Sequence, residues 1–280
     1  MPTIQENALI VVFNASVFNP KKTDIRATRE VVEKYEAHDA GKFVKAILPE
    51  SAVSDIAKIV SAARQYHYCN SLPWLQDGGR IIPVGHYPTY STHMAAFKEK
   101  FDAAVSVFCT NYLSAIELAR ARLKGLFDQA DYPAAEAVRG KFRFNVVSLP
   151  IPSSSDFRIS GLSAEVRQQV DASVAETVTA GINEVTGRVR ECLQKIVERL
   201  QNPENTFRNS LISNLEEINR LIPVFNITDS RVLHVLNESI APLARLDPEL
   251  LRQNVAARAE ACAKAKEILS TYLVDENEEI

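Results

Sequence analysis

The chain has 280 residues, of which 46% are hydrophobic and 24% are charged, and its formal net charge is -3. This composition is typical of a globular protein with a substantial core, and the small net charge gives no general attraction to nucleic acid or to an anionic membrane. The N-terminus lacks the charged and apolar regions of a signal peptide, so we expect a cytoplasmic protein. The cysteines agree with this expectation, because they lie far apart without disulfide or zinc-ligand spacing: Cys69, Cys109, Cys192 and Cys262.

Residues 1–88 predict a small α/β region. β-branched and aromatic residues predict a strand over 8–18, and a polar residue at 23 or 24 can cap a helix that ends near residue 39. A second short strand is expected over 42–48 and a second helix over 51–68. The chain therefore opens with the order strand, helix, strand, helix.

The segment 72–84 carries the strongest turn signal of the chain. Its sequence Asp77-Gly78-Gly79 offers backbone positions where a positive φ costs little, and apolar residues flank it on both sides. We therefore expect a short hairpin, which would hold the single tryptophan, Trp74, and the cation Arg80.

Two long helices dominate the segment 89–202. Apolar residues recur at an average step of roughly 3.6 residues over 92–127 and roughly 3.8 over 163–200, close to the helical period. Because a long apolar stripe requires a partner of similar length, we expect the two helices to pack as an antiparallel pair, as in a coiled coil. The sequence leaves open whether they pair within one chain or between chains.

A β insertion is expected between these helices, at about 131–160, with strands over 141–149 and 156–159. Cations alternate there with phenylalanines: Arg139, Lys141, Phe142, Arg143 and Phe144. A period of two places cations on one face of a strand and aromatic rings on the other, which is typical of a strand whose apolar side faces the core. A single-stranded nucleic-acid site would have both on one exposed face. The cations remain candidate binding residues, together with Trp74 and Arg80.

The segment 203–280 predicts a bundle of helices and an acidic tail. Helices are expected over about 206–222 and 229–243, and a third should run from Pro248 to about Leu273 after a capping aspartate. Four of the last six residues are acidic: Asp275, Glu276, Glu278 and Glu279.

Sequence motifs for catalysis are absent. The glycines form no phosphate-binding loop, and neither a GxSxG elbow nor an HExxH zinc motif occurs. His67, Cys69, His86 and His93 are close in sequence, but their spacing fits no structural zinc pattern. We therefore expect no enzymatic activity, no cofactor and no metal site, and rank last an enzyme that uses the segment 67–93.

The chain resembles an uncharacterised protein family of tailed phages and prophages. The matching segments span nearly the whole chain: ATREV at 27–31, LPW and DGGRIIP within 72–83, DYP and VRGKFRF within 131–144, DFRI at 156–159, FRNSLISNL at 207–215 and NITD at 226–229. Genes of this family are often found near a MoxR-type AAA ATPase and a von Willebrand A protein. The resemblance implies a phage or prophage origin, a host-cytoplasm location and an adaptor or substrate role beside such a machine, and it assigns no role to any residue.

The expected fold is mainly α with small β elements (α+β): elongated, with the long helical pair, a β tip and a C-terminal helical bundle. The expected function is that of a non-enzymatic interaction or adaptor protein that binds another protein, with no membrane association. The alternative is a phage DNA-transaction protein that binds single-stranded nucleic acid through Arg80, Arg139, Lys141 and Arg143. The sequence leaves the partner and the oligomeric state open.

Overall fold

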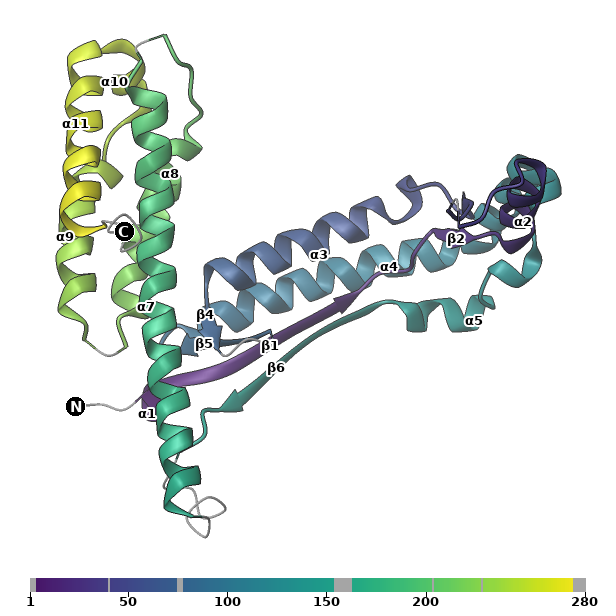
Figure 1. Ribbon diagram of the computed structural model, residues 1–280, viewed down its shortest axis with the longest axis horizontal. Helices are drawn as coiled ribbons and strands as arrows, with labels where there is room; N and C mark the ends of the chain where they lie inside the picture. The colour runs from purple at the N-terminus through teal and green to yellow at the C-terminus, as the bar shows by residue number, and fades with distance from the viewer. Residues whose placement is uncertain are drawn as a thin grey trace. The chain divides into compact units, whose positions relative to one another are not determined.

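The computed structural model describes residues 4–39, 41–74, 78–153, 163–202, 204–227 and 229–273 (Figure 1). Two compact units are built from non-consecutive segments, whereas the sequence suggested regions divided near residues 88 and 202. Unit 1 comprises residues 1–12, 69–88 and 148–280, and unit 2 comprises residues 13–68 and 89–147. The predicted strand over 156–159 and the acidic tail lie outside the described residues.

Helices make up most of the described chain, and the predicted mainly α fold with small β elements is confirmed. The two longest helices are α4 (Tyr87–Leu123) and α7 (Ala164–Leu200), each of 37 residues. They correspond to the two long apolar stripes, although α4 begins earlier and ends earlier than its stripe predicts. No helix of the described residues is long and apolar enough to cross a membrane.

A four-stranded sheet has the strand order β4-β5-β1-β6. Its strands are β1 (Ala8–Ser16), β4 (Leu72–Trp74), β5 (Gly79–Pro83) and β6 (Arg143–Pro150). β4 and β5 form the predicted hairpin, in which Trp74 pairs with Gly79. Gly78 has φ +77°, a conformation that glycine adopts without the steric penalty of a Cβ atom. β5 pairs in turn with β1, antiparallel, from Arg80 opposite Val11 to Pro83 opposite Ala8.

Unit 1 is a helical bundle that packs against this hairpin. Besides α7 it contains α1 (Ile4–Asn7), α8 (Ser210–Phe225), α9 (Arg231–Ala244), α10 (Pro248–Gln253) and α11 (Val255–Tyr272). α7 packs against α8, α11 and β4, and α9 packs against α8 and α11. Gly181 brings α7 close to the hairpin, since a Cβ atom there would lie 3.3 Å from Leu72 Cδ1. The apolar core of the bundle includes Val185, Val189, Leu193 and Ile196 of α7.

The predicted pairing of the two long helices is wrong. α7 is a member of the unit 1 bundle, where α8 and α11 cover its stripe, while nearly all of α4 belongs to unit 2. Periodicity identifies which face of a helix is apolar, but it does not identify what covers that face. Two shorter helices from later in the chain supply the apolar surface that a second long helix was expected to supply.

The last predicted helix is interrupted. α10 ends at Gln253, and Asn254 adopts an extended conformation with φ -121° and ψ 107°. Its side-chain oxygen accepts a hydrogen bond from the backbone N–H of Ala257 and so caps α11. Asparagine is a favourable N-cap residue, and one cap of this kind is enough to divide a continuous apolar pattern into two helices.

Unit 2 contains the rest of β1 and most of β6, with β2 (Lys21–Thr23), α2 (Ile25–Lys34), β3 (Val44–Ala46), α3 (Ser51–Cys69), most of α4, α5 (Ala135–Val138) and the 3₁₀ turns η1 (Lys124–Leu126), η2 (Gln129–Asp131) and η3 (Arg139–Lys141). The stripe of α4 is covered by aromatic rings of β1, β6 and the residues beside them. Ring centroids lie 5.4 Å apart for Phe101 and Phe144, and 5.1 Å apart for Phe108 and Phe142. β2 and β3 form a separate two-stranded sheet beside α2.

Candidate protein-interaction surface

Trp74 and Arg80 lie in the interior of unit 1. Trp74 belongs to the apolar core and is 7% exposed. Arg80 is also 7% exposed; its Nε donates to Ser71 Oγ over 2.8 Å and its Nη2 donates to the Ser71 carbonyl oxygen over 2.7 Å. The Glu184 carboxylate on α7 lies 3.7 Å from Arg80 Nη2. These two side chains therefore hold the hairpin in unit 1 and present no exposed binding group.

The three cations at 139–143 are exposed on unit 2, and the neighbouring Phe142 and Phe144 are buried. The alternation expected from the sequence is therefore present. However, β6 begins only at Arg143, and Arg139 and Lys141 lie on the preceding turn η3. Because the rings of Phe142 and Phe144 face the core, neither is available beside these cations for a base to stack on.

His67 and His86 contact different side chains, in different units. His67 Nδ1 lies 2.7 Å from the Tyr90 hydroxyl in unit 2, and His86 Nε2 lies 3.0 Å from Asn70 Oδ1 in unit 1. Within the described residues no three His, Cys, Asp or Glu side chains are placed to hold a metal ion. Burial raises the pKa of the Cys69 thiol, which disfavours the reactive thiolate form.

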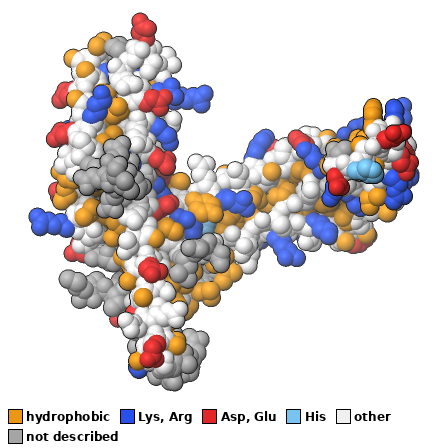
Figure 2. Space-filling view, viewed as in Figure 1, with side chains coloured by type: hydrophobic (Ala, Val, Ile, Leu, Met, Phe, Trp, Pro, Cys, Tyr) orange, Lys and Arg blue, Asp and Glu red, His pale blue; other side chains and the backbone are white. Residues whose placement is uncertain are grey.

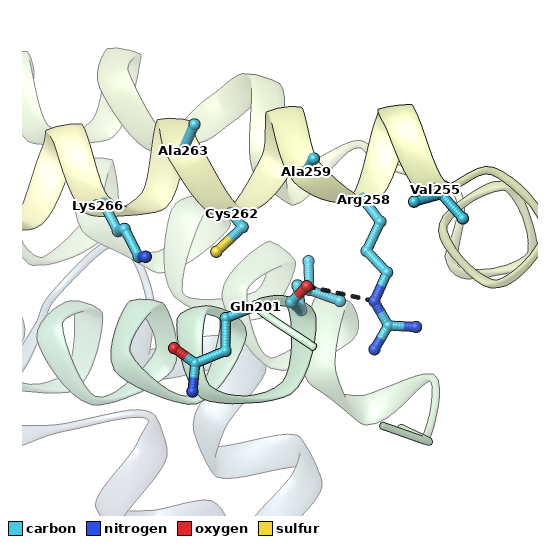
Figure 3. A pocket seen from close by; sticks show the side chains of 8 residues that line it. Gln201, Val255, Arg258, Ala259, Cys262, Ala263 and Lys266 are labelled. Carbon is cyan, nitrogen blue, oxygen red and sulfur yellow. Dashed lines mark hydrogen bonds between the residues drawn. The ribbon is translucent and has the colours of Figure 1, made fainter. Parts of the chain in front are cut away.

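A hollow of about 250 Å³ in unit 1 lies between the end of α7 and α11 (Figure 3). Small side chains, including Ala259 and Ala263, line it beside Cys262. Arg258 extends from α11 to the end of α7, where its guanidinium donates to the carbonyl oxygens of residues 199, 200, 202 and 205. This buried arginine satisfies carbonyls that a helix end leaves unpaired, so we assign the hollow a structural role.

Several large apolar side chains on or beside α2 and β3 of unit 2 are exposed. Their exposed fractions are 39% to 71%: Ile25, Val31, Tyr35, Phe43 and Val44. We call these five residues the α2–β3 surface. α2 is strongly amphipathic, yet Ala27 is its only buried residue. Exposed apolar side chains that gather on one part of a surface are typical of interaction sites.

Hydrogen bonds at its first turn fix α2 against β3. Asp24 is the N-cap, and its Oδ1 accepts from the Ala27 N–H over 3.0 Å. The Asp24 N–H donates to the Phe43 carbonyl over 2.9 Å. The Thr28 hydroxyl accepts from the Phe43 N–H, also over 2.9 Å. The helix and the strand segment that carry the exposed apolar residues are thus joined through backbone groups.

A buried ion cluster links the start of α2, strand β3 and the turn η2. Lys45 Nζ lies 2.6 Å from Asp24 Oδ2, 2.7 Å from Asp131 Oδ2 and 2.8 Å from the Leu126 carbonyl oxygen. The side chains of Lys45 and Asp24 are each 4% exposed, and Lys22 approaches Asp131 from the solvent side at 3.0 Å. Two cations and two carboxylates balance, so the cluster is neutral.

The ion cluster stays charged at neutral pH. The hydrogen bond from Lys45 holds the pKa of Asp24 below its usual value. Burial opposes charge on Asp131 and Lys45, but their mutual pairing outweighs it, so the pKa of Asp131 is lowered and that of Lys45 is raised. The Tyr132 hydroxyl adds a hydrogen bond of 2.9 Å to the Ile47 carbonyl. These contacts anchor the first turn of α2 to the segment 43–47.

The side chains around the α2–β3 surface include many charged groups. Figure 2 shows Lys and Arg side chains gathered at the α2 end of unit 2, with carboxylates and apolar side chains among them. The sequence did not identify this surface, because a helical stripe predicts an apolar face and says nothing about its exposure.

Comparison with protein-family models, with curated proteins and with solved structures finds no match to this chain.

Proposed function

We propose that this protein is a non-enzymatic interaction protein that binds a protein partner through the α2–β3 surface of unit 2. The observation that carries the proposal is the exposure of five large apolar side chains on and beside α2 and β3, Ile25 by 71% and Tyr35 by 69%, next to a buried ion cluster that includes the N-cap of α2. A helix that is amphipathic and rigidly held, but left uncovered, is typical of helix-mediated recognition.

Exposed apolar side chains supply the affinity of such a contact. Each Å² of apolar surface removed from water gives a gross gain of about 25 cal/mol. Much of that gain is offset by the lost freedom of the two partners. Tyr35 is the natural anchor, because tyrosine combines a large apolar ring with a polar end and is enriched among residues that dominate binding energies.

The resemblance to the phage and prophage family suggests which partners to test. The AAA ATPase of MoxR type and the von Willebrand A protein that neighbour those genes are the first candidates. An adaptor role would have the α2–β3 surface bind one of these proteins while unit 1 remains available to another. This assignment rests on the resemblance alone.

Binding to single-stranded nucleic acid is the second candidate. It is favoured by the exposure of Arg139, Lys141 and Arg143 and by the charge of unit 2, whose 17 Lys and Arg against 13 Asp and Glu give +4. The buried rings of Phe142 and Phe144 weigh against it, since stacking supplies much of the affinity for single strands. Anisotropy of labelled oligonucleotides at two salt concentrations decides, because phosphate-driven binding must weaken with salt.

The protein-binding proposal is tested by affinity capture with three baits from bacteria that carry the gene. The baits are the wild type, a variant with Val31→Glu and Tyr35→Glu, and a control with Leu113→Glu and Leu118→Glu. The control residues are 63% and 74% exposed on α4 in the same unit, so the control makes the same charge change on similarly exposed residues. Circular dichroism checks that each bait is folded.

The proposal expects one protein to be retained by the wild type and the control and lost with the α2 variant. Purified separately, that protein should bind the wild type directly and bind the α2 variant at least tenfold more weakly. The proposal fails if no protein distinguishes the three baits, or if the captured protein binds the α2 variant with unchanged affinity.

A further inference from the structure

Three cations lie within five residues on the surface of unit 2: Arg139, Lys141 and Arg143, here called the basic segment. No carboxylate of the described residues forms an ion pair with any of them. The Arg139 guanidinium donates to the Ser106 hydroxyl on α4 over 3.2 Å, which fixes one end of the segment. Glu136 is exposed one turn earlier, and the stretch 136–143 keeps a surplus of positive charge.

The chain also contains a segment of opposite charge. Residues 275–280 read DENEEI and carry four carboxylates. They follow α11 of unit 1, whose last turn is tied to α7 by a hydrogen bond of 3.2 Å from Arg190 Nε to the Leu273 carbonyl oxygen. Unit 1 has 22 Asp and Glu against 15 Lys and Arg, a net charge of -7, while unit 2 has a net charge of +4. Positive and negative charge are therefore separated between the units.

The two segments are complementary in charge. The basic segment carries three cations within five residues, and residues 275–280 carry four carboxylates within six, so several opposite charges can pair in one contact. The segments belong to different units, so a contact between two copies would be heterologous, with a different surface contributed by each copy.

We infer that the basic segment of one copy binds residues 275–280 of a second copy. The contact is electrostatic, and its groups are exposed, so it forms at low ionic strength and is screened at high ionic strength. This self-association is separate from the α2–β3 surface, and either can fail without the other.

Charge reversal provides the test. One variant reverses the basic segment with Arg139→Glu, Lys141→Glu and Arg143→Glu. A second reverses the tail by changing its four carboxylates to lysine: Asp275, Glu276, Glu278 and Glu279. A third carries both sets of changes. Molar mass is measured by light scattering on the full chain over a range of protein concentrations, at about 20 mM and about 300 mM NaCl, where the Debye length falls from about 20 Å to about 6 Å.

The wild type should exceed the monomer mass of 31.1 kDa at low salt and return to it at high salt. Each single reversal should stay at the monomer mass in both conditions, and the double reversal should associate again at low salt. An equimolar mixture of the two single reversals should also associate, because each then supplies the charge that the other lacks.

Three results overturn the inference. They are a wild type that stays monomeric at low salt, association that survives reversal of the basic segment, and a mixture of the two single reversals that fails to associate. The last result, with a double reversal that behaves as the wild type, would show that the segments meet within one chain.

Discussion

Lys45→Met tests the buried ion cluster that holds α2 and β3. Methionine keeps most of the apolar volume of the lysine side chain but removes the charge and its donors. Asp24, whose side chain is 4% exposed, would lose its cation and keep only its bonds at the start of α2. Asp131 would keep Lys22, whose side chain is 48% exposed, at 3.0 Å.

The expected cost is about 3 kcal/mol of unfolding free energy. Removing one partner of a buried ion pair costs about 3–5 kcal/mol, because the other charge stays buried and uncompensated. The lower end applies because Lys22 still neutralises Asp131. Adding Asp24→Asn to Lys45→Met should recover part of this loss, since it removes the uncompensated charge while asparagine still caps α2.

Urea unfolding followed by far-UV circular dichroism measures the cost, and hydrogen exchange of peptides within residues 21–48 locates it. Lys21→Met is the matched control, because Lys21 pairs with Glu50 at the surface, where their side chains are 50% and 72% exposed; its urea midpoint should stay near that of the wild type. The reasoning is refuted if Lys45→Met costs less than about 1 kcal/mol, or if faster exchange is absent from 21–48.

Three further predictions concern the ion cluster, the end of α7 and the two faces of β6. The pKa values of Asp24 and Asp131 are lowered in the folded state. Their contribution to stability is therefore complete above the unfolded pKa of about 4, and it is lost as the pH falls through the lowered values. Asp24→Asn should reduce the loss of stability between about pH 5 and pH 2, measured by urea titrations. Arg258→Met should cost about 2–4 kcal/mol in thermal or urea unfolding, because the buried carbonyls at the end of α7 lose their donor. Phe144→Ala should cost about 3–5 kcal/mol and Arg143→Ala about 0.5 kcal/mol or less, and similar costs for the two would contradict the assigned faces of β6.

Local chemistry was sufficient to predict most of the helices and strands. The apolar stripe over 163–200 placed α7 to within a residue, and the glycines at 78 and 79 placed the β4–β5 hairpin. A helix was expected to start at Thr23 or Asp24, and Asp24 is the N-cap of α2. These features depend on neighbours in sequence, so the sequence carries them directly.

Partners distant in sequence could not be predicted. The stripe of α7 was assigned to α4 because the lengths matched, while the bundle uses α8 and α11. The sequence suggested that Arg80 is an exposed cation beside a turn. In the structure Arg80 is buried, donates a hydrogen bond to Ser71 and lies near the Glu184 carboxylate. In each case the sequence shows that a residue needs an apolar or a charged partner, but several segments of the chain could have supplied that partner.

The candidate site was missed for the same reason. The residues of α2 predict an ordinary amphipathic helix, and nothing in their spacing shows that Val31 and Tyr35 remain exposed. The ion cluster joins Asp24, Lys45 and Asp131 from three separate parts of the chain, so it too becomes visible only in the folded unit.

The capture experiment with three baits tests the central claim most directly. The account predicts a protein that is retained by the wild type and by the Leu113→Glu, Leu118→Glu control, and that is lost with Val31→Glu, Tyr35→Glu. The purified partner should then bind the α2 variant at least tenfold more weakly than the wild type. Equal binding to all three folded proteins would contradict the claim that the α2–β3 surface is the docking site.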